Sequence, residues 1–257
     1  MKKDPVTRWS EILKDFKEDY LMVRAWHDDP VKNAKGIYIG SLADTLQGIA
    51  VMEYILHQDV MKFKTGLVEA TKVASEHFTR FNAGEPIDES QVSMLCYQEL
   101  LDALASGDME VALMFSRLMG GREEIEREHD HLFAIAMGYT LKAILEDKLG
   151  HINQRLYQLD QACMDREYRN FTGYPVIFRG IVNKNLNKIS EGFSIILKQH
   201  AKECKPGRMF YGITDEYLYT WGIGMANLCR YKGFDVQISD PLIPSELLIP
   251  VFKGNGE

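Results

Sequence analysis

The sequence lacks the long apolar runs and the paired cysteines that indicate a membrane span, a clustered zinc site or a redox motif. Its four cysteines lie far apart and form no C-x-x-C pair. No apolar segment approaches the roughly 20 residues of a transmembrane helix, and charges interrupt the N-terminal segment MKKDPVTRWSEILKDF, unlike a secretory signal. We therefore expect a cytoplasmic protein with no membrane partner. The cysteines expected to be reduced and buried are Cys96, Cys163, Cys204 and Cys229.

An excess of positive charge is also missing. The chain has 30 Lys and Arg against 37 Asp and Glu, a formal net charge of −7. Proteins that bind nucleic acid directly present clustered cations to the phosphate backbone, so this balance argues against direct nucleic-acid binding and favours a basic partner. With 257 residues and 46% hydrophobic composition, the chain can bury a substantial core. We expect one domain over 1–257, with a possible N-terminal subregion 1–84 and a C-terminal region 100–250.

Strand-like alternation of apolar and polar residues is nearly absent before the C-terminal tail. Apolar residues instead recur at the spacing of amphipathic helices, which predicts an all-α fold. One stripe contains Trp9, Ile12, Leu13, Phe16, Tyr20 and Val23, and another contains Val60, Phe63, Leu67, Ala70 and Ala74.

Four windows share one pattern: an apolar helix end, a short polar break and a new apolar stripe. They are ILHQDVMKFKTGLVEA, LASGDMEVALMFSRLM, ILEDKLGHINQRLYQL and IVNKNLNKISEGFSII. Short connections force consecutive helices to pack as neighbours. We therefore expect stacked antiparallel helical hairpins, a degenerate helical repeat, followed by a short extended C-terminal tail.

The segment EREHDH, residues 126–131, contains the densest group of chemically active side chains. We expect it near the start of one helix over 123–145, with Leu132 on the core face; the helix dipole then favours its carboxylates. The pairs Glu126–His129 and Glu128–His131 also have the Glu-x-x-His spacing of di-iron helical bundles. Such sites need a second Glu-x-x-His on another helix, and the chain contains no further one. We therefore expect no metal-binding residues.

No other motif indicates catalysis. The chain has no glycine-rich phosphate loop and no G-x-S-x-G nucleophile elbow, so we predict no catalytic residue and no cofactor. In EYLYTWGIGMANLCRYKGFDV, Trp221 lies at helical spacing with other apolar residues, which favours a core position over a binding platform. Gly222 and Gly224 weaken that helix, and we expect a neighbouring helix to pack close against them.

The C-terminal half, roughly residues 100–250, resembles a known family. The order of ILKQHAKEC, YLYTWGIGMANLCRYKGFDV and SDPLIPSELL is similar to that of bacterial immunity protein family forty-nine of polymorphic-toxin systems. Members of that family more often carry a tyrosine where this chain has Leu242. A second resemblance is to the helical immunity partners of PoNe-type DNase toxins, which end in a similar aromatic helix and proline-rich segment.

The resemblance implies a non-enzymatic protein that binds and neutralises a toxin encoded by a neighbouring gene. The expected toxin acts in the cytoplasm and is a nuclease or a nucleotide-targeting effector. A basic cleft in such a toxin would face acidic residues, for which the candidates are Glu123, Glu124, Glu126 and Asp130. Two alternatives stay open: a helical-repeat adaptor for protein ligands, and a helical metalloenzyme using His129 and His131.

Overall fold

A computed structural model describes residues 4–252, and this part of the chain contains helices and no β-strand. The prediction of an all-α fold is confirmed. The α-helices are α1 (Pro5–His27), α2 (Ile37–His57), α3 (Val60–Asn82), α4 (Tyr97–Ser106), α5 (Met109–Leu118), α6 (Glu123–His129), α7 (Leu132–Leu145), α8 (Ile152–Ala162), α9 (Gly173–Val182), α10 (Leu186–Glu203) and α11 (Thr220–Tyr231). The 3-10 helices are η1 (Glu89–Val92), η2 (Met94–Cys96), η3 (Arg169–Phe171), η4 (Thr214–Glu216) and η5 (Ser245–Leu247).

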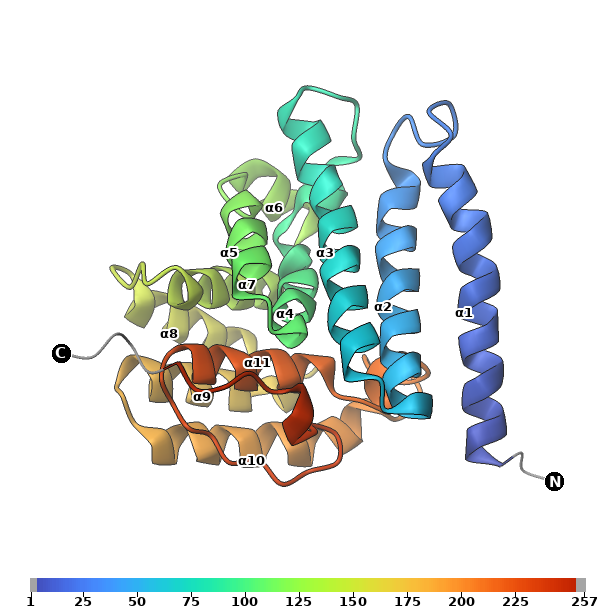
Figure 1. Cartoon of the computed structure of the whole chain (residues 1–257). Coiled ribbons are helices and arrows are strands. Elements are labelled where there is room, and N and C mark those ends of the chain that lie inside the picture. The colour runs from blue at the N-terminus through green and yellow to red at the C-terminus, as the bar shows by residue number, and fades with distance from the viewer. Residues whose placement is uncertain (1–3, 253–257) are drawn as a thin grey trace.

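The long helices α1, α2 and α3 stand side by side in chain order, and α9, α10 and α11 run crosswise to them (Figure 1). Helix α4 connects these two parts because it packs against both α3 and α11. Among the described residues, no helix is both long and apolar enough to cross a bilayer.

The four predicted polar breaks all separate consecutive helices that pack against each other. At each break one residue has a left-handed backbone: Gln58 (φ 54°), Gly107 (φ 80°), Asp147 (φ 56°) and Lys184 (φ 50°). A left-handed residue ends the hydrogen-bond ladder of a helix and turns the chain back. The sequence therefore located these turns correctly.

The predicted apolar stripes mostly point inward. Phe63 and Leu67 on α3 are fully buried, and one hydrophobic core extends through the described chain from Val23 to Leu248. Trp221 is 5% exposed, with its ring centroid 5.4 Å from that of Tyr97. The prediction that Trp221 belongs to the core is thus confirmed.

The helix expected over 123–145 is interrupted, so this prediction is wrong. Helix α6 ends at His129, and α7 begins at Leu132. The His131 Nδ1 atom accepts a hydrogen bond from the Ala134 amide at 3.1 Å and caps α7. Leu132 is 74% exposed and does not face the core as expected. In a continuous helix the Ala134 amide would donate to a backbone carbonyl. At this interruption the His131 ring supplies the acceptor instead.

Candidate interaction surface

The four acidic residues that the sequence suggests for toxin binding differ in their exposure to solvent. Glu123 and Glu124 are exposed in the first turn of α6, and Glu126 is buried in the same helix. Asp130 is half-buried in the break between α6 and α7. Only the exposed pair can meet a partner without a change in the fold.

Glu126 joins α6 to α7. Its carboxylate is 3% exposed and accepts hydrogen bonds from the Tyr139 hydroxyl at 2.8 and 3.1 Å and from the Arg122 amide at 3.1 Å. Burial, together with this acceptor, raises the pKa of Tyr139 to about 12. Buried carboxylates need such donors, so Glu126 has a structural role in this fold.

Asp130 and His131 also have structural partners. Asp130 accepts hydrogen bonds from the Met94 amide at 2.6 Å and the Leu95 amide at 3.2 Å, and so holds η2 against the α6–α7 break. His131 caps α7, and its ring centroid lies 4.6 Å from that of Tyr168. In the part of the chain that the structure describes, no group of three His, Cys, Asp or Glu side chains is arranged to hold a metal ion.

Replacing Asp130 with alanine is expected to lower the free energy of unfolding by about 2 kcal/mol, because two amides of η2 lose a charged acceptor. Asp130→Asn keeps one acceptor oxygen and should cost less. Urea unfolding measures both variants. The control is Glu128→Ala, which changes an exposed side chain near the end of α6. A loss as large in the control as in Asp130→Ala would contradict the assigned role.

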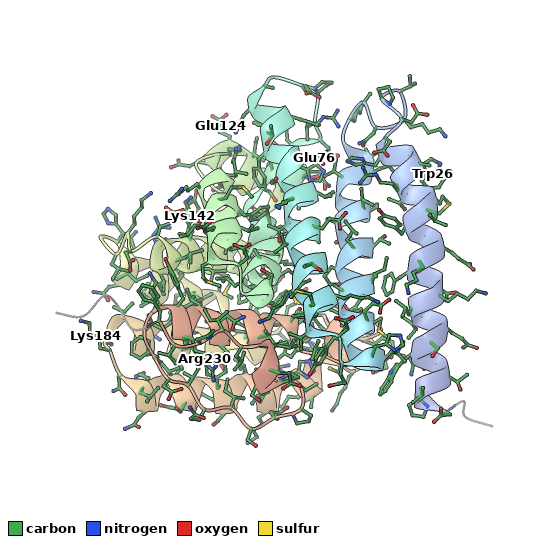
Figure 2. All side chains as sticks on the ribbon, in the orientation of Figure 1. Trp26, Glu76, Glu124, Lys142, Lys184 and Arg230 are labelled. Carbon is green, nitrogen blue, oxygen red and sulfur yellow. The ribbon has the colours of Figure 1, made fainter. Side chains whose placement is uncertain are left out.

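Exposed carboxylates from two segments gather next to this break. Helix η1 packs against α6, and together they present the acidic surface, which we define as Asp88, Glu89, Glu123, Glu124 and Glu128. No described residue forms an ion pair with any of these five carboxylates. Figure 2 labels Glu124 on the side of the molecule away from α10.

Two exposed leucines accompany the acidic surface. Leu95 in η2 is 43% exposed and Leu132 at the start of α7 is 74% exposed. Asp130, which binds the Leu95 amide, precedes Leu132 by two positions and keeps both leucines close to α6. No sequence pattern indicates Asp88, Glu89 or Leu95 as part of this surface. They precede α6 by about 30 positions, and only tertiary contacts place them next to α6.

A cleft of about 490 Å³ borders the acidic surface between α6, α7 and α8. Glu123 and Glu126 line it with His151 and Arg155. The Arg155 guanidinium lies 4.7 Å from the centre of the Tyr139 ring, a cation–π contact. Arg127 also lines the cleft, so two arginines lie beside the carboxylates and the cleft has mixed charge.

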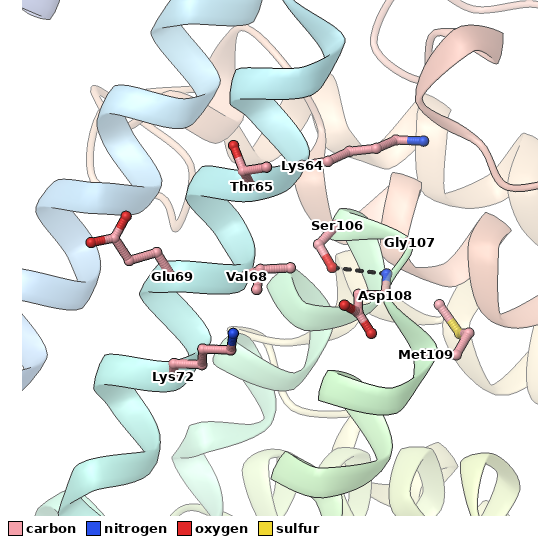
Figure 3. A pocket seen from close by; sticks show the side chains of 9 residues that line it. All are labelled: Lys64, Thr65, Val68, Glu69, Lys72, Ser106, Gly107, Asp108 and Met109. Atoms are coloured by element: carbon pink, nitrogen blue, oxygen red, sulfur yellow. Dashed lines mark hydrogen bonds between the residues drawn. The ribbon is translucent and has the colours of Figure 1, made fainter.

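A groove of about 830 Å³ lies between α3 and the α4–α5 turn (Figure 3). Its polar groups include Lys64 and Lys72, and burial lowers the pKa of Lys64. The Asp108 carboxylate accepts hydrogen bonds from the Glu110 and Val111 amides at 3.1 Å and caps α5. Among the lining residues there is no histidine or cysteine. The groove therefore does not pair a nucleophile with an imidazole base.

Three carboxylates that no sequence pattern indicates lie in the core or at its edge: Asp215 is buried, and Glu99 and Asp102 are half-buried. Burial raises the pKa of Glu99 to about 7 and that of Asp215 to about 6, and it raises the pKa of Asp102 well above its usual range. Glu99 and Asp102 border a void of only about 10 Å³, close to the smallest volume that holds one water molecule. We therefore assign these carboxylates to the electrostatics of folding.

Comparisons with protein-family models, with curated proteins and with solved structures find no match for this chain.

Proposed function

We propose that this chain is an immunity protein that binds one basic toxin domain, encoded by a neighbouring gene, and neutralises it without catalysis. The observation that carries the proposal is the acidic surface, where carboxylates that form no ion pair with any described residue lie beside the exposed Leu95 and Leu132. The resemblance of the C-terminal half to immunity protein family forty-nine supports it. In this proposal the hairpins form a degenerate helical repeat that ends in a short extended tail and presents the surface as a rigid face.

The two kinds of side chain have different roles in the proposed complex. Carboxylates complementary to a basic cleft accelerate encounter and exclude partners of the wrong charge. Leu95 and Leu132 supply apolar area that becomes buried at the centre of the interface, surrounded by a charged rim. A nuclease or a nucleotide-targeting toxin fits this arrangement because its substrate is also an anion. Occupation of that cleft by the acidic surface would exclude the substrate.

The proposal also states where the toxin is inhibited and what the complex requires. The toxin would act in the cytoplasm, where the immunity protein meets it, and the complex would need no cofactor. The surface that binds the toxin is negatively charged, so it would repel nucleic acid.

Reversing two charges of the acidic surface, in the variant Glu124→Lys with Glu128→Lys, is expected to slow association with the toxin domain about tenfold at low salt. The control variant is Glu167→Lys with Glu191→Lys, which makes the same charge change at exposed positions distant in sequence from α6. Stopped-flow or surface plasmon resonance measures the association rates. The control should associate at close to the wild-type rate.

Equal association rates in the two double variants would reject the acidic surface as the binding face. A growth assay tests the function itself, because wild-type protein should rescue cells that express the neighbouring toxin domain. Absence of rescue would contradict the immunity proposal. Capture of several unrelated ligands with weak affinity would favour an adaptor, and one equivalent of metal lost in His131→Ala would favour a metalloenzyme.

A further inference from the structure

A pocket of about 410 Å³ lies at the C-terminal end of α10, where basic side chains from three segments meet. Arg169 comes from η3, Lys202 from the last turn of α10, and Lys205 and Arg208 from the loop that follows. Figure 1 shows α10 at the opposite end of the molecule from α6. This pocket is therefore distinct from the acidic surface.

The loop sequence explains how two of these cations come together. In Lys205-Pro206-Gly207-Arg208, the Arg208 amide donates a hydrogen bond to the Lys205 carbonyl at 3.0 Å. Gly207 has φ +76°, a left-handed conformation that suits the third residue of a type II turn, and proline suits the second. The first and last residues of such a turn lie close together, so the turn brings Lys205 next to Arg208.

Glu203 brings the three segments into contact. Its side chain is almost fully buried and accepts hydrogen bonds from Asn170 Nδ2 at 2.5 Å and from the Met209 amide at 3.3 Å. The first bond holds η3 and the second holds the loop against the end of α10. Glu203 thereby fixes the backbone next to Arg169 and Arg208, the neighbours of its two partners, and both of these residues line the pocket.

The four cations have no ion pair and no side-chain hydrogen bond among residues 4–252. The negative C-terminus of α10 stabilises Lys202, but Arg169 and Arg208 belong to other segments. The residues that line the pocket include four cations and no carboxylate, in a chain whose net charge is −7, and the nearby Glu203 carboxylate is buried and bonded to Asn170 and the Met209 amide. Like charges that line one pocket repel one another, and an anion bound between them relieves that repulsion.

We propose that this pocket binds a compact, multiply charged phosphate anion, the di- or triphosphate group of a small molecule. Guanidinium groups bind phosphate oxygens in pairs, and ammonium groups add point charges. The lining contains no aromatic side chain for a base to stack on, so recognition rests on the phosphates. The proposal does not depend on the toxin-binding function, because the two surfaces share no residue.

Titration calorimetry of the full chain with inorganic tripolyphosphate at low salt tests this inference. We expect saturable binding of one equivalent, at least about tenfold tighter than orthophosphate or sulfate, since more charge meets the four cations. The variant Arg169→Gln with Arg208→Gln should weaken tripolyphosphate binding by about tenfold or more. The matched control, Lys14→Gln with Lys35→Gln, removes two positive charges at exposed positions outside the pocket and should retain the wild-type affinity.

A second variant distinguishes a loss of binding from a loss of folding. Lys202→Gln with Lys205→Gln changes only exposed side chains and should also weaken binding while circular dichroism stays unchanged. Absence of binding, equal affinity for sulfate, or an equal loss in the control variant would overturn the assignment. Tighter binding of a single-stranded RNA oligomer, lost in the same variants, would also overturn it in favour of a nucleic-acid site.

Discussion

Gly224→Ala is expected to lower the free energy of unfolding by about 3 kcal/mol, among the larger effects of a single methyl group. A Cβ atom on Gly224 would lie 2.4 Å from the Leu101 carbonyl oxygen and 3.4 Å from the Ala105 amide nitrogen. Both are backbone atoms of α4 and cannot move aside as the end of a side chain can. Helices α4 and α11 would have to separate, and the core packing between them would weaken.

The control is Gly150→Ala, because a Cβ atom at Gly150 would meet no atom within 4 Å and its backbone is not left-handed. Such a substitution restricts the unfolded chain and is expected to be neutral or slightly stabilising. Urea unfolding with a constant m-value measures both effects. Equal stability of the two variants would show that α4 and α11 approach less closely than the structure indicates.

Stability is expected to fall as the pH rises from about 5 to 8, because the interior carboxylates lose protons in the folded protein. Burial raises the pKa of Glu99 from 4.5 to about 7 and that of Asp215 from 3.8 to about 6. Between those values the folded state binds more protons than the unfolded state, so raising the pH favours unfolding. Glu99 alone should change the free energy of unfolding by about 3 kcal/mol over this window.

Glu99→Gln removes the charge at nearly constant volume. It should raise the stability at pH 8 by about 2 kcal/mol and flatten the pH dependence, because no buried charge then forms. The matched control is Glu128→Gln on the exposed face of α6. Thermal or urea unfolding at several pH values gives the comparison. An unchanged slope in Glu99→Gln would show that this carboxyl titrates normally.

The pKa of Glu146 shifts in the opposite direction, downwards, so its contribution to the free energy of unfolding is lost at low pH. Burial raises its pKa, but the ion pair with Lys148 and the hydrogen bonds from Lys142 and Ser116 outweigh burial and lower the pKa to about 2. Its ion pairs span 2.7 Å to Lys148 and 2.9 Å to Lys142. The stability they add is present above the ordinary pKa of 4.5 and is lost as the pH falls towards 2. The greatest stability is therefore expected near pH 5.

The sequence alone indicated that the described chain is helical and where four hairpins turn. Apolar spacing and short polar breaks are local signals, and residues such as Gly107 end a helix through their own backbone preference. The close contact at Gly224 was also predictable, because a glycine inside an apolar helix costs stability unless a neighbour uses the space. The burial of Trp221 followed from helical spacing in the same way.

The structural roles of the acidic residues in segment 126–131 depend on tertiary contacts alone. Glu126 is buried because Tyr139, thirteen positions later, donates to it, and Asp130 binds amides 35 and 36 positions earlier. Helical periodicity carries no information about such partners, so the sequence predicted one continuous helix and four equivalent acidic candidates. The basic pocket was unpredictable for the same reason: Arg169 and Arg208 line one pocket because Glu203 binds a neighbour of each.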